Sequence, residues 1–267
     1  MREHVASARK HRLTIGLVPT MGALHEGHGA LMRLAREETG YVVATIFVNP
    51  TQFDRPEDLQ KYPRDLESDL AFCERLSVDA VFAPGAREMY PGDLHQKMPL
   101  ASVEVSGISS RLEGEFRPGH FRGVATVVAK LFNIIPADRA YFGEKDAQQL
   151  AVIQKMVADL NFPVEIVPVP TVREPDGLAM SSRNQRLTPE QRNIAPVIYK
   201  ALREAERSIQ AALEMLSAAP EIQVEYFEAV DPKTFEPVDK MKGPVRIVTA
   251  VRLGDVRLID NLLVSIR

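Results

Sequence analysis

The chain has 267 residues, of which 45% are hydrophobic and 26% are charged, a composition typical of a globular protein with one or two domains. Its net charge of −3 and its lack of tryptophan argue against a nucleic-acid binder, which needs a basic surface and stacking side chains. No apolar run approaches the roughly 18 residues that span a membrane. Cys73 is the single cysteine, which excludes an internal disulfide and fits a cytoplasmic location. We therefore expect neither nucleic acid nor membrane among the partners.

Strand-like and helix-like segments alternate along the first part of the chain. The expected strands are residues 13–18, 41–48, 78–83, 139–142 and 164–169. The expected helices are residues 30–38, 65–76, 123–135 and 147–160. In the second of these helices, the residues expected to face inward are Leu66, Leu70, Cys73 and Leu76. The alternation predicts an α/β fold with a doubly wound parallel sheet.

The pattern changes near residue 172. One long helical stretch is expected at residues 188–217, with a break or kink near Pro196. Strands are expected at 224–230, 246–252 and 256–264, the last two joined by a hairpin at 253–255. These features predict a smaller α+β domain, so we expect a first domain at 1–171 and a second at 172–267.

Residues 19–28 read Pro-Thr-Met-Gly-Ala-Leu-His-Glu-Gly-His and lie between the first strand and the first helix. Open α/β sheets bind ligands at this edge, and a helix N-terminus there offers free N–H groups to phosphate. His25 and His28 can both donate hydrogen bonds to phosphate oxygens that gain charge during a reaction. A zinc site is the competing interpretation, but the spacing is His-x-x-His and no obvious third ligand follows. A lone histidine would suggest a surface or core residue, whereas this pair between glycines favours a functional site.

Two further segments carry groups that suit a triphosphate. Lys145 follows a strand in the sequence Gly-Glu-Lys-Asp and can reach a phosphate, while Asp146 is equally suited to capping the next helix. Residues 180–183, Met-Ser-Ser-Arg, place two hydroxyls and a guanidinium on a loop that can hold a leaving pyrophosphate. Taken alone, this last string also fits an exposed polar turn.

Neither the Walker nor the dinucleotide fingerprint is present. The pattern His25-x-Gly27-His28 instead resembles the HxGH signature of the nucleotidyl-transferase superfamily. Its members attack the α-phosphate of a nucleotide and release pyrophosphate. Residues 180–183 loosely resemble the KMSKS loop that accompanies this signature.

Seven ordered strings, from about residue 13 to the C-terminus, together resemble the pantothenate synthetase (pantoate–beta-alanine ligase) family. They are PTMGALHEGH (19–28), FVNPTQF (47–53), YPRDLESD (62–69), RPGHFRGV (117–124), GEKDAQQL (143–150), DGLAMSSRN (176–184) and RLIDN (257–261). The resemblance implies that (R)-pantoate and ATP form pantoyl-adenylate with Mg²⁺, and that β-alanine then displaces AMP. It also implies a Rossmann-like first domain, a C-terminal lid domain, a homodimer and a cytoplasmic enzyme.

The matched strings imply a role for individual residues. Catalytic roles are implied for His25, His28, Lys145 and Arg183. Contacts with ATP are implied for Met21, Gly22, Ala23, Leu24, His25, Glu26, Gly27, His28, Gly143, Glu144, Lys145, Asp146, Val172, Met180, Ser181, Ser182 and Arg183. Contacts with pantoate or β-alanine are implied for Thr20, Met21, Asn49, Gln52, Glu113, Arg117, His120 and Gln149. Asp69 is the implied carboxylate of the magnesium shell, in which phosphates and water supply most ligands.

Two residues depart from the family pattern. Asp54 replaces the usual glycine after Gln-Phe, and Ala147 replaces the usual aromatic residue after Gly-Glu-Lys-Asp. Both border the expected pantoate site, so we expect them to affect pantoate affinity. Two other functions remain open from the residues: a nucleotidyl transferase that stops at a nucleotide product, and a non-catalytic nucleotide-binding module. The neutral pair Gln52 and Gln149 favours the ligase.

Overall fold

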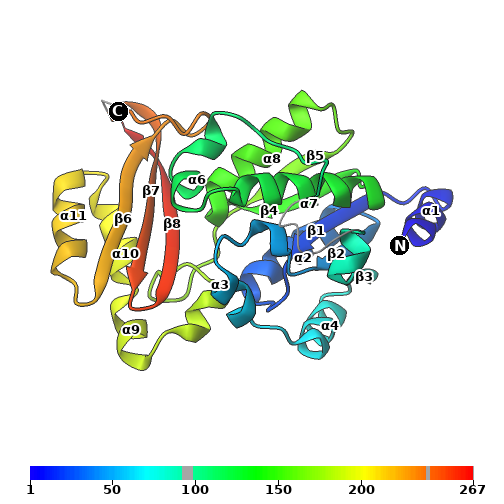
Figure 1. Ribbon diagram of the computed structural model, residues 1–267, viewed down its shortest axis with the longest axis horizontal. Helices are drawn as coiled ribbons and strands as arrows, with labels where there is room; N and C mark the ends of the chain where they lie inside the picture. Colours follow the sequence, from blue (N-terminus) through cyan, green and yellow to red (C-terminus); the bar gives the residue numbers. More distant parts are fainter. Residues whose placement is uncertain (92–98, 239–240, 267) are drawn as a thin grey trace. The chain divides into compact units, whose positions relative to one another are not determined.

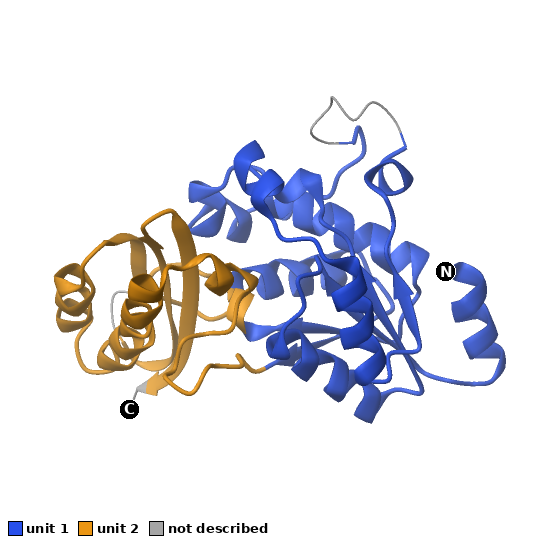
Figure 2. Ribbon diagram, turned by 90° about the horizontal axis from the view of Figure 1, so that it is seen from below, with its two compact units in different colours: residues 1–144, 148–169 blue, residues 145–147, 170–267 orange. Residues whose placement is uncertain are grey.

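The computed structural model describes residues 1–91, 99–238 and 241–266. The chain divides into two compact units, which are coloured blue and orange in Figure 2. The first unit holds residues 1–144 and 148–169, and the second holds residues 145–147 and 170–267. The domain boundary expected after residue 171 stays a prediction, because compactness does not show that either part folds independently.

A five-stranded parallel sheet forms the centre of the first unit, with the strand order β3–β2–β1–β4–β5 (Figure 1). The strands are β1 (Ile15–Thr20), β2 (Tyr41–Ile46), β3 (Ala80–Phe82), β4 (Arg139–Gly143) and β5 (Glu165–Val169). They fall on the five segments that the sequence predicts as strands, and the predicted α/β fold is confirmed. Because the order reverses between β1 and β4, the carboxyl ends of these two strands border the usual ligand-binding crevice.

Helices cover both faces of this sheet. The helices along this part of the chain are α1 (Arg2–Lys10), α2 (Glu26–Glu38), α3 (Pro56–Lys61), α4 (Leu66–Arg75), α5 (Ala86–Met89), α6 (Glu113–Phe116), α7 (His120–Ile134) and α8 (Ala147–Asp159), with short 3₁₀ turns η1 (Pro50–Gln52), η2 (Ile108–Ser110) and η3 (Glu144–Asp146). Successive strand side chains point to opposite sides. Leu17 and Val43 therefore join the core with α7 and α8, whereas Val18 and Ala44 join the core with α2 and α4.

Helix α4 buries a different side from the predicted one. Leu66 and Leu70 are 48% and 43% exposed, so their predicted inward positions are wrong. Cys73 is buried as predicted, and Asp69, in place of a leucine, is only 4% exposed. The reason is that the Asp69 carboxylate accepts backbone N–H groups from the loop before α2, and this polar contact decides which side of α4 faces inward.

The helices α2 and α1 also differ from the prediction. Helix α2 begins at Glu26 rather than at residue 30, because His25 caps it. Helix α1 was not predicted at all, although Val5 and Ala8 bury one side of it against the first core.

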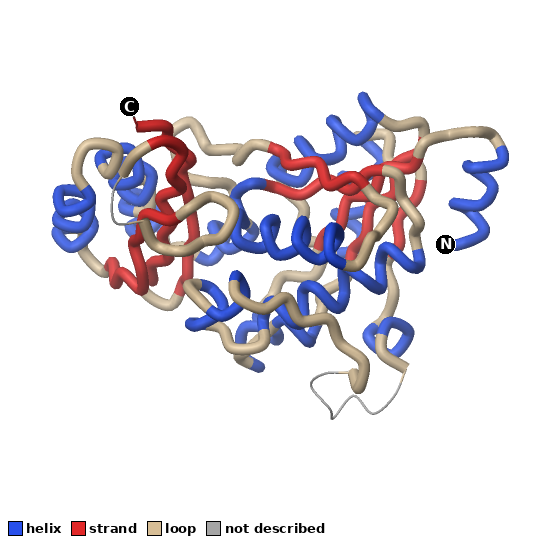
Figure 3. Tube along the Cα trace, turned by 90° about the horizontal axis from the view of Figure 1, so that it is seen from above, coloured by secondary structure: helices blue, strands red, loops and turns tan. Residues whose placement is uncertain are grey.

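The second unit contains a three-stranded antiparallel sheet, whose strands are red near the C-terminus in Figure 3. Its strand order is β6–β7–β8 (Figure 1). Its strands are β6 (Ile222–Val230), β7 (Gly243–Leu253) and β8 (Val256–Ile266). The predicted hairpin is confirmed, since Leu253 pairs with Val256 across the turn. None of the helices in the described part of the chain is long and apolar enough to cross a bilayer.

The helical stretch expected at 188–217 is broken near Pro196 as predicted, but a second break, at residues 205–208, was not predicted. The segment forms three helices, α9 (Pro189–Ile194), α10 (Val197–Glu204) and α11 (Ile209–Ala218). Each start has a local cause. Thr188 and Gln191 form a capping box before α9, Pro196 stands at the N-cap of α10, and the Ser208 hydroxyl accepts the Ala211 N–H before α11.

Candidate active site

The loop that joins β1 to α2, residues 20–28, is held in place by buried polar groups; we call it the His loop. The Asp69 carboxylate accepts the N–H of Ala23 at 2.9 Å and the N–H of Leu24 at 2.7 Å. The Thr20 hydroxyl donates to the Thr45 carbonyl at 2.6 Å and accepts the Gly22 N–H at 3.2 Å. The loop therefore has a fixed backbone conformation at the carboxyl end of β1.

The two histidines of the His loop cap helix α2 reciprocally. His25 Nδ1 accepts the Gly27 N–H at 3.1 Å, and His28 Nδ1 accepts the His25 N–H at 3.3 Å. The ring centroids are 4.1 Å apart. A ring nitrogen that accepts a hydrogen bond carries no proton, so each neutral imidazole has its proton on Nε2. In that tautomer the donor of each ring is Nε2–H, the kind of group that can hold a phosphate oxygen.

The backbone of the His loop has fewer available donors than the sequence suggests. The N–H groups of Gly22, Ala23, Leu24, His25 and Gly27 all have acceptors within the first unit. The expectation of free N–H groups is therefore not met at these five positions. The donors that suit a phosphate at this loop are the imidazole Nε2–H groups.

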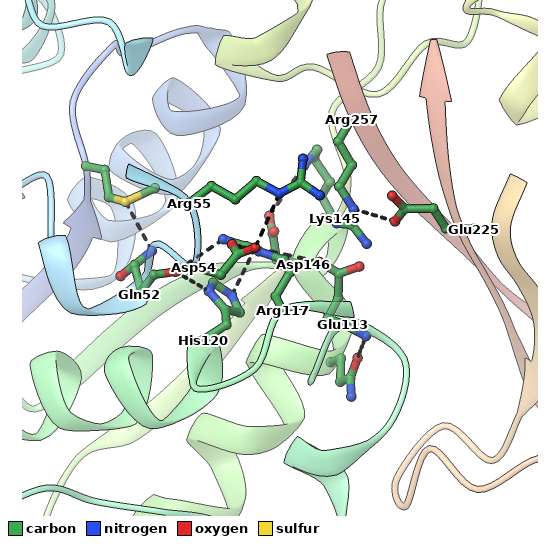
Figure 4. Close-up of polar contacts among 12 residues, drawn as sticks. Gln52, Asp54, Arg55, Glu113, Arg117, His120, Lys145, Asp146, Glu225 and Arg257 are labelled. Atoms are coloured by element: carbon green, nitrogen blue, oxygen red, sulfur yellow. Dashed lines mark hydrogen bonds and ion pairs between the residues drawn. The ribbon is translucent and has the colours of Figure 1, made fainter. Parts of the chain in front are cut away.

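Gln52 lies beside the His loop in η1. Its side-chain amide is 3.1 Å from the Met21 sulfur on one side (Figure 4). On the other side it accepts a hydrogen bond from Asn49 Nδ2 at 3.0 Å. Gln52 is only 7% exposed. Met21 therefore brings the predicted ATP loop and the predicted pantoate amide into contact.

Arg117 and His120 contact the backbone of the same turn (Figure 4). Arg117 Nη2 donates to the Gln52 carbonyl at 3.3 Å, and His120 Nδ1 donates to the same carbonyl at 2.8 Å. His120 Nε2 is then the acceptor for Arg117 Nη1 at 3.3 Å. Asp54 Oδ1 is 3.5 Å from Arg117 Nε, and Glu113 Oε2 is 3.7 Å from Nη1. Asp54, a departure from the family pattern, thus adds a carboxylate beside this arginine.

Gln148 is a residue that the sequence interpretation missed. It is buried, and its Nε2 donates to the carbonyls of Ile108 at 2.7 Å and Arg111 at 2.8 Å, while its Oε1 accepts the Glu113 N–H at 3.2 Å. It therefore ties the segment that carries Glu113 to helix α8. Its neighbour Gln149, the predicted pantoate ligand, is half-buried. The string GEKDAQQL contains both glutamines, but only the fold distinguishes which one faces the core.

A cavity of about 410 Å³ opens near the carboxyl ends of β2 and β3. Met21 and Asp69 contribute to its lining, together with Phe47, Leu59 and Arg64 among others. Its volume is in the range of small-molecule sites. Gln52 and Gln149 are not among its lining residues, although Met21, which contacts Gln52, is one of them.

Most of the other predicted phosphate-binding groups belong to the second unit, whereas Gly143 and Glu144 still belong to the first. Gly143 ends β4, and Glu144 opens the 3₁₀ turn η3. In that turn Lys145 Nζ is 3.5 Å from Asp146 Oδ2 (Figure 4), and the Lys145 carbonyl accepts a hydrogen bond from Asn261 Nδ2 at 2.9 Å. The backbone of Lys145 is therefore attached to β8 of the second unit.

The predicted pyrophosphate loop is the end of a short hairpin in the second unit. Val172 and Met180 join its arms through the Met180 N–H and the Val172 carbonyl at 3.0 Å. The Ser181 hydroxyl accepts the Arg183 N–H at 3.2 Å and caps η4 (Ser182–Arg186). Ser182 is buried and Arg183 is half-buried.

An ion pair fixes the base of this hairpin. Arg173 donates to both oxygens of Asp260 at 2.6 and 2.9 Å, and its guanidinium lies 3.9 Å from the Tyr199 ring centroid. Such a bidentate pair sets both distance and orientation.

Among the described residues, no cluster of three or more His, Cys, Asp or Glu side chains could hold a metal ion. Asp69 is the carboxylate beside the His loop, and its two oxygens already accept backbone N–H groups.

A parallel α/β sheet with a His-x-Gly-His loop after β1 is the arrangement that the sequence predicts for a nucleotide-handling enzyme. The family model of pantoate-beta-alanine ligase matches residues 1–263. The chain belongs to the pantoate–beta-alanine ligase family.

Relatives at high identity cover almost the whole chain. Pantothenate synthetase of Moorella thermoacetica is 50% identical over 277 residues, which cover 100% of this chain and 96% of the relative. The crystal structure of pantothenate synthetase from Thermus thermophilus matches with a TM-score of 0.90 at 49% identity, covering 97% of this chain and 96% of that one. The pantoate-beta-alanine ligase of Francisella tularensis, complexed with beta-gamma ATP and beta-alanine, matches with a TM-score of 0.83 at 38% identity, covering 98% and 95%.

Proposed function

We propose that the chain joins pantoate to β-alanine at the expense of ATP. In the first step a carboxylate oxygen of pantoate attacks the α-phosphorus of ATP, and pyrophosphate leaves. In the second step the amine of β-alanine attacks the acyl carbon of pantoyl-adenylate, AMP leaves, and one proton is released. Family membership over residues 1–263 supports this reaction, as does the Francisella tularensis relative complexed with beta-gamma ATP and beta-alanine.

The observation that carries the proposal is the tautomer of the two histidines. Because both Nδ1 atoms accept backbone N–H groups, both Nε2–H groups are donors before the substrate arrives. Donors fixed in advance stabilise charge that develops in the transition state without reorganisation. His28, assisted by His25, would hold the oxygens that gain charge as pyrophosphate leaves.

The remaining charges act against the repulsion between a carboxylate and a polyanion. Lys145 and Arg183 would supply positive charge to the triphosphate, and Ser181 and Ser182 would supply hydroxyl donors. Mg²⁺, bound with ATP, would neutralise part of the phosphate charge, with Asp69 as the carboxylate on its protein side. Gln52 and Gln149 are neutral, so they can hold pantoate without a competing charge. The labile adenylate requires protection from water, for which the second unit would serve as a lid.

The proposal extends to the assembly and the compartment. We expect a homodimer that acts in the cytoplasm, with pantoate, β-alanine and ATP as its small-molecule partners. Both expectations rest on the family.

A nucleotidyl transferase without amide ligation is the second candidate. The HxGH loop would serve it equally well. The buried amide of Gln52 beside Met21 favours the ligase, since it offers a neutral hydrogen-bonding group for an organic acid next to the nucleotide loop.

The test is single-turnover pyrophosphate release. We expect a pyrophosphate burst that requires pantoate, and AMP turnover that also requires β-alanine. The His28→Ala variant should lower the burst rate by about 10²–10³, the usual loss for one charge-stabilising donor. His4→Ala, an exposed histidine on α1, is the matched control and should behave as the wild type. Pyrophosphate release without pantoate would indicate a simple nucleotidyl transferase, and none under any condition would indicate a binding module.

A further inference from the structure

A chain of buried hydrogen bonds lies behind Gln52. Asn49 is 1% exposed, and its Oδ1 accepts the Tyr90 hydroxyl at 2.8 Å and the Thr51 hydroxyl at 2.9 Å. Its Nδ2 donates to Gln52 Oε1 at 3.0 Å and to the Gly123 carbonyl at 3.3 Å. Both amide hydrogens of Asn49 are therefore used within the protein.

Two backbone groups determine which atoms donate and which accept in this series of hydrogen bonds. The Gly123 carbonyl can only accept, so the Asn49 atom that faces it must be the amide nitrogen. The Thr51 N–H can only donate, and it lies 3.4 Å from the other Asn49 atom, which must be the oxygen. The orientation of Asn49 thus does not depend on a choice between two similar side-chain atoms.

The orientation of Gln52 follows from that of Asn49. Since Asn49 donates to it, the Gln52 atom on that side is Oε1, and Nε2 points the other way, to within 3.1 Å of the Met21 sulfur. A thioether sulfur is a weak acceptor, so a carboxylate or hydroxyl oxygen of a substrate would replace it as a better one. The Nε2 group of Gln52 is consequently the donor that faces the substrate.

We propose that Tyr90 and Asn49 are positioning residues that hold the Gln52 amide with its NH₂ group toward the substrate, so that Gln52 selects a hydrogen-bond acceptor on the organic acid. The proposal rests on the proposed function, in which Gln52 holds pantoate. Asn49, predicted as a substrate contact, acts here through Gln52. A substrate with an N–H donor at this position would meet a donor and bind poorly.

Tyr90 is the buried last member of this series of hydrogen bonds, and it permits a conservative test. Burial raises the pKa of its hydroxyl above the usual value, so it remains a protonated donor at neutral pH. Its ring centroid is 6.2 Å from that of Phe47, and the Lys130 ammonium lies 5.5 Å from it. Tyr90→Phe keeps both ring contacts and removes only the hydroxyl.

The first measurement compares Tyr90→Phe with Tyr41→Phe, which removes a hydroxyl at the start of β2. In Tyr90→Phe we expect the KM for pantoate to rise roughly three- to ten-fold, as for the loss of one hydrogen bond, while the KM for ATP and kcat stay within about two-fold. Tyr41→Phe should leave all three unchanged. A fall in kcat with an unchanged pantoate KM would overturn the proposal.

The second measurement places Tyr90→Phe in a Gln52→Ala background. If Tyr90 acts through Gln52, its removal should change the pantoate KM by less than about two-fold there. The same rise in both backgrounds would show a general structural role and overturn the proposal. If Gln52→Ala itself leaves the pantoate KM unchanged, the proposal falls because Gln52 is not a pantoate ligand, whereas the pyrophosphate assay still decides the reaction separately.

Discussion

Asp69 shows how one side chain can determine the shape of a loop that it does not belong to. Its two carboxylate oxygens accept two successive N–H groups of the His loop, and its Oδ2 is 2.7 Å from where a Cβ on Gly22 would lie. Gly22 and Ala23 both have positive φ, at 80° and 51°, a conformation that costs free energy at Ala23. The carboxylate compensates this cost and fixes the loop.

Asp69→Asn should therefore weaken the protein even without a metal. The amide places a donor opposite a backbone N–H, and we expect a loss of about 1–3 kcal/mol in the free energy of unfolding together with a higher KM for ATP. Thermal and denaturant unfolding without Mg²⁺ and ATP provide the measurement.

Asp65→Asn is the control on the same helix. Asp65 caps α4 through the Ser68 N–H at 3.0 Å, and asparagine caps as well as aspartate does. Unfolding unchanged in Asp69→Asn, with only the dependence on Mg²⁺ altered, would assign this carboxylate to the metal instead.

The residues of this site that the sequence predicts are those that belong to a recognisable motif. His25, His28 and Gln52 lie in recognisable strings, and the structure places the strings of His28 and Gln52 side by side through Met21. Tyr90 and Gln148 were missed because their roles depend on contacts with residues distant in sequence. For Asp69 the sequence predicts only the carboxylate beside magnesium, because a sequence shows the carboxylate but not the backbone N–H groups that it also accepts.

At the scale of elements, the approach of η1 to α7 requires a glycine. A Cβ on Gly123 would lie 2.4 Å from the Thr51 carbonyl oxygen and 2.8 Å from the Gln52 Cα. These are backbone atoms, so the turn itself would have to move. The turn carries Asn49 and Gln52, so its distance from α7 also sets the hydrogen bond between Asn49 and the Gly123 carbonyl.

Gly123→Ala should destabilise the protein by about 1–3 kcal/mol, although alanine favours helix formation at an ordinary helical position. The KM for pantoate should rise as η1 shifts. Gly85→Ala is the matched control, since no atom lies within 4 Å of its added Cβ. Equal stability of the two variants by denaturant unfolding would contradict this account.

At the scale of the whole molecule, the predicted catalytic groups are distributed over both units. His28 belongs to the first unit, whereas Lys145 and Arg183 belong to the second. In the proposed mechanism His28 donates a hydrogen bond, and Lys145 and Arg183 supply positive charge, in the same transition state.

The variants His28→Ala and Arg183→Ala should therefore be strongly non-additive. Groups that stabilise one transition state together lose most of their effect once either is absent. The double variant should release pyrophosphate at a rate within about ten-fold of the slower single variant in single-turnover experiments. Fully multiplicative effects would show that the two groups act in different steps.

The overall architecture was predictable from the alternation of strand and helix patterns, because a parallel sheet leaves near-continuous apolar runs such as residues 41–48. The second unit was less predictable. The break at Pro196 was predicted, but the break before Ser208 was not, since helical periodicity continues across it and Ser208 marks a helix start only once its backbone partner is known.

Cys73 offers a built-in reporter for part of this molecule. It is the chain's single thiol, it is buried in α4 one turn from Asp69, and burial, with a smaller contribution from Asp69, raises its pKa to about 11. The reactive thiolate is then about a thousandth of the population at pH 8, and the folded core shields even that fraction. The rate at which an alkylating reagent labels the native protein thus measures how often α4 detaches, and so how often the His loop loses its anchor.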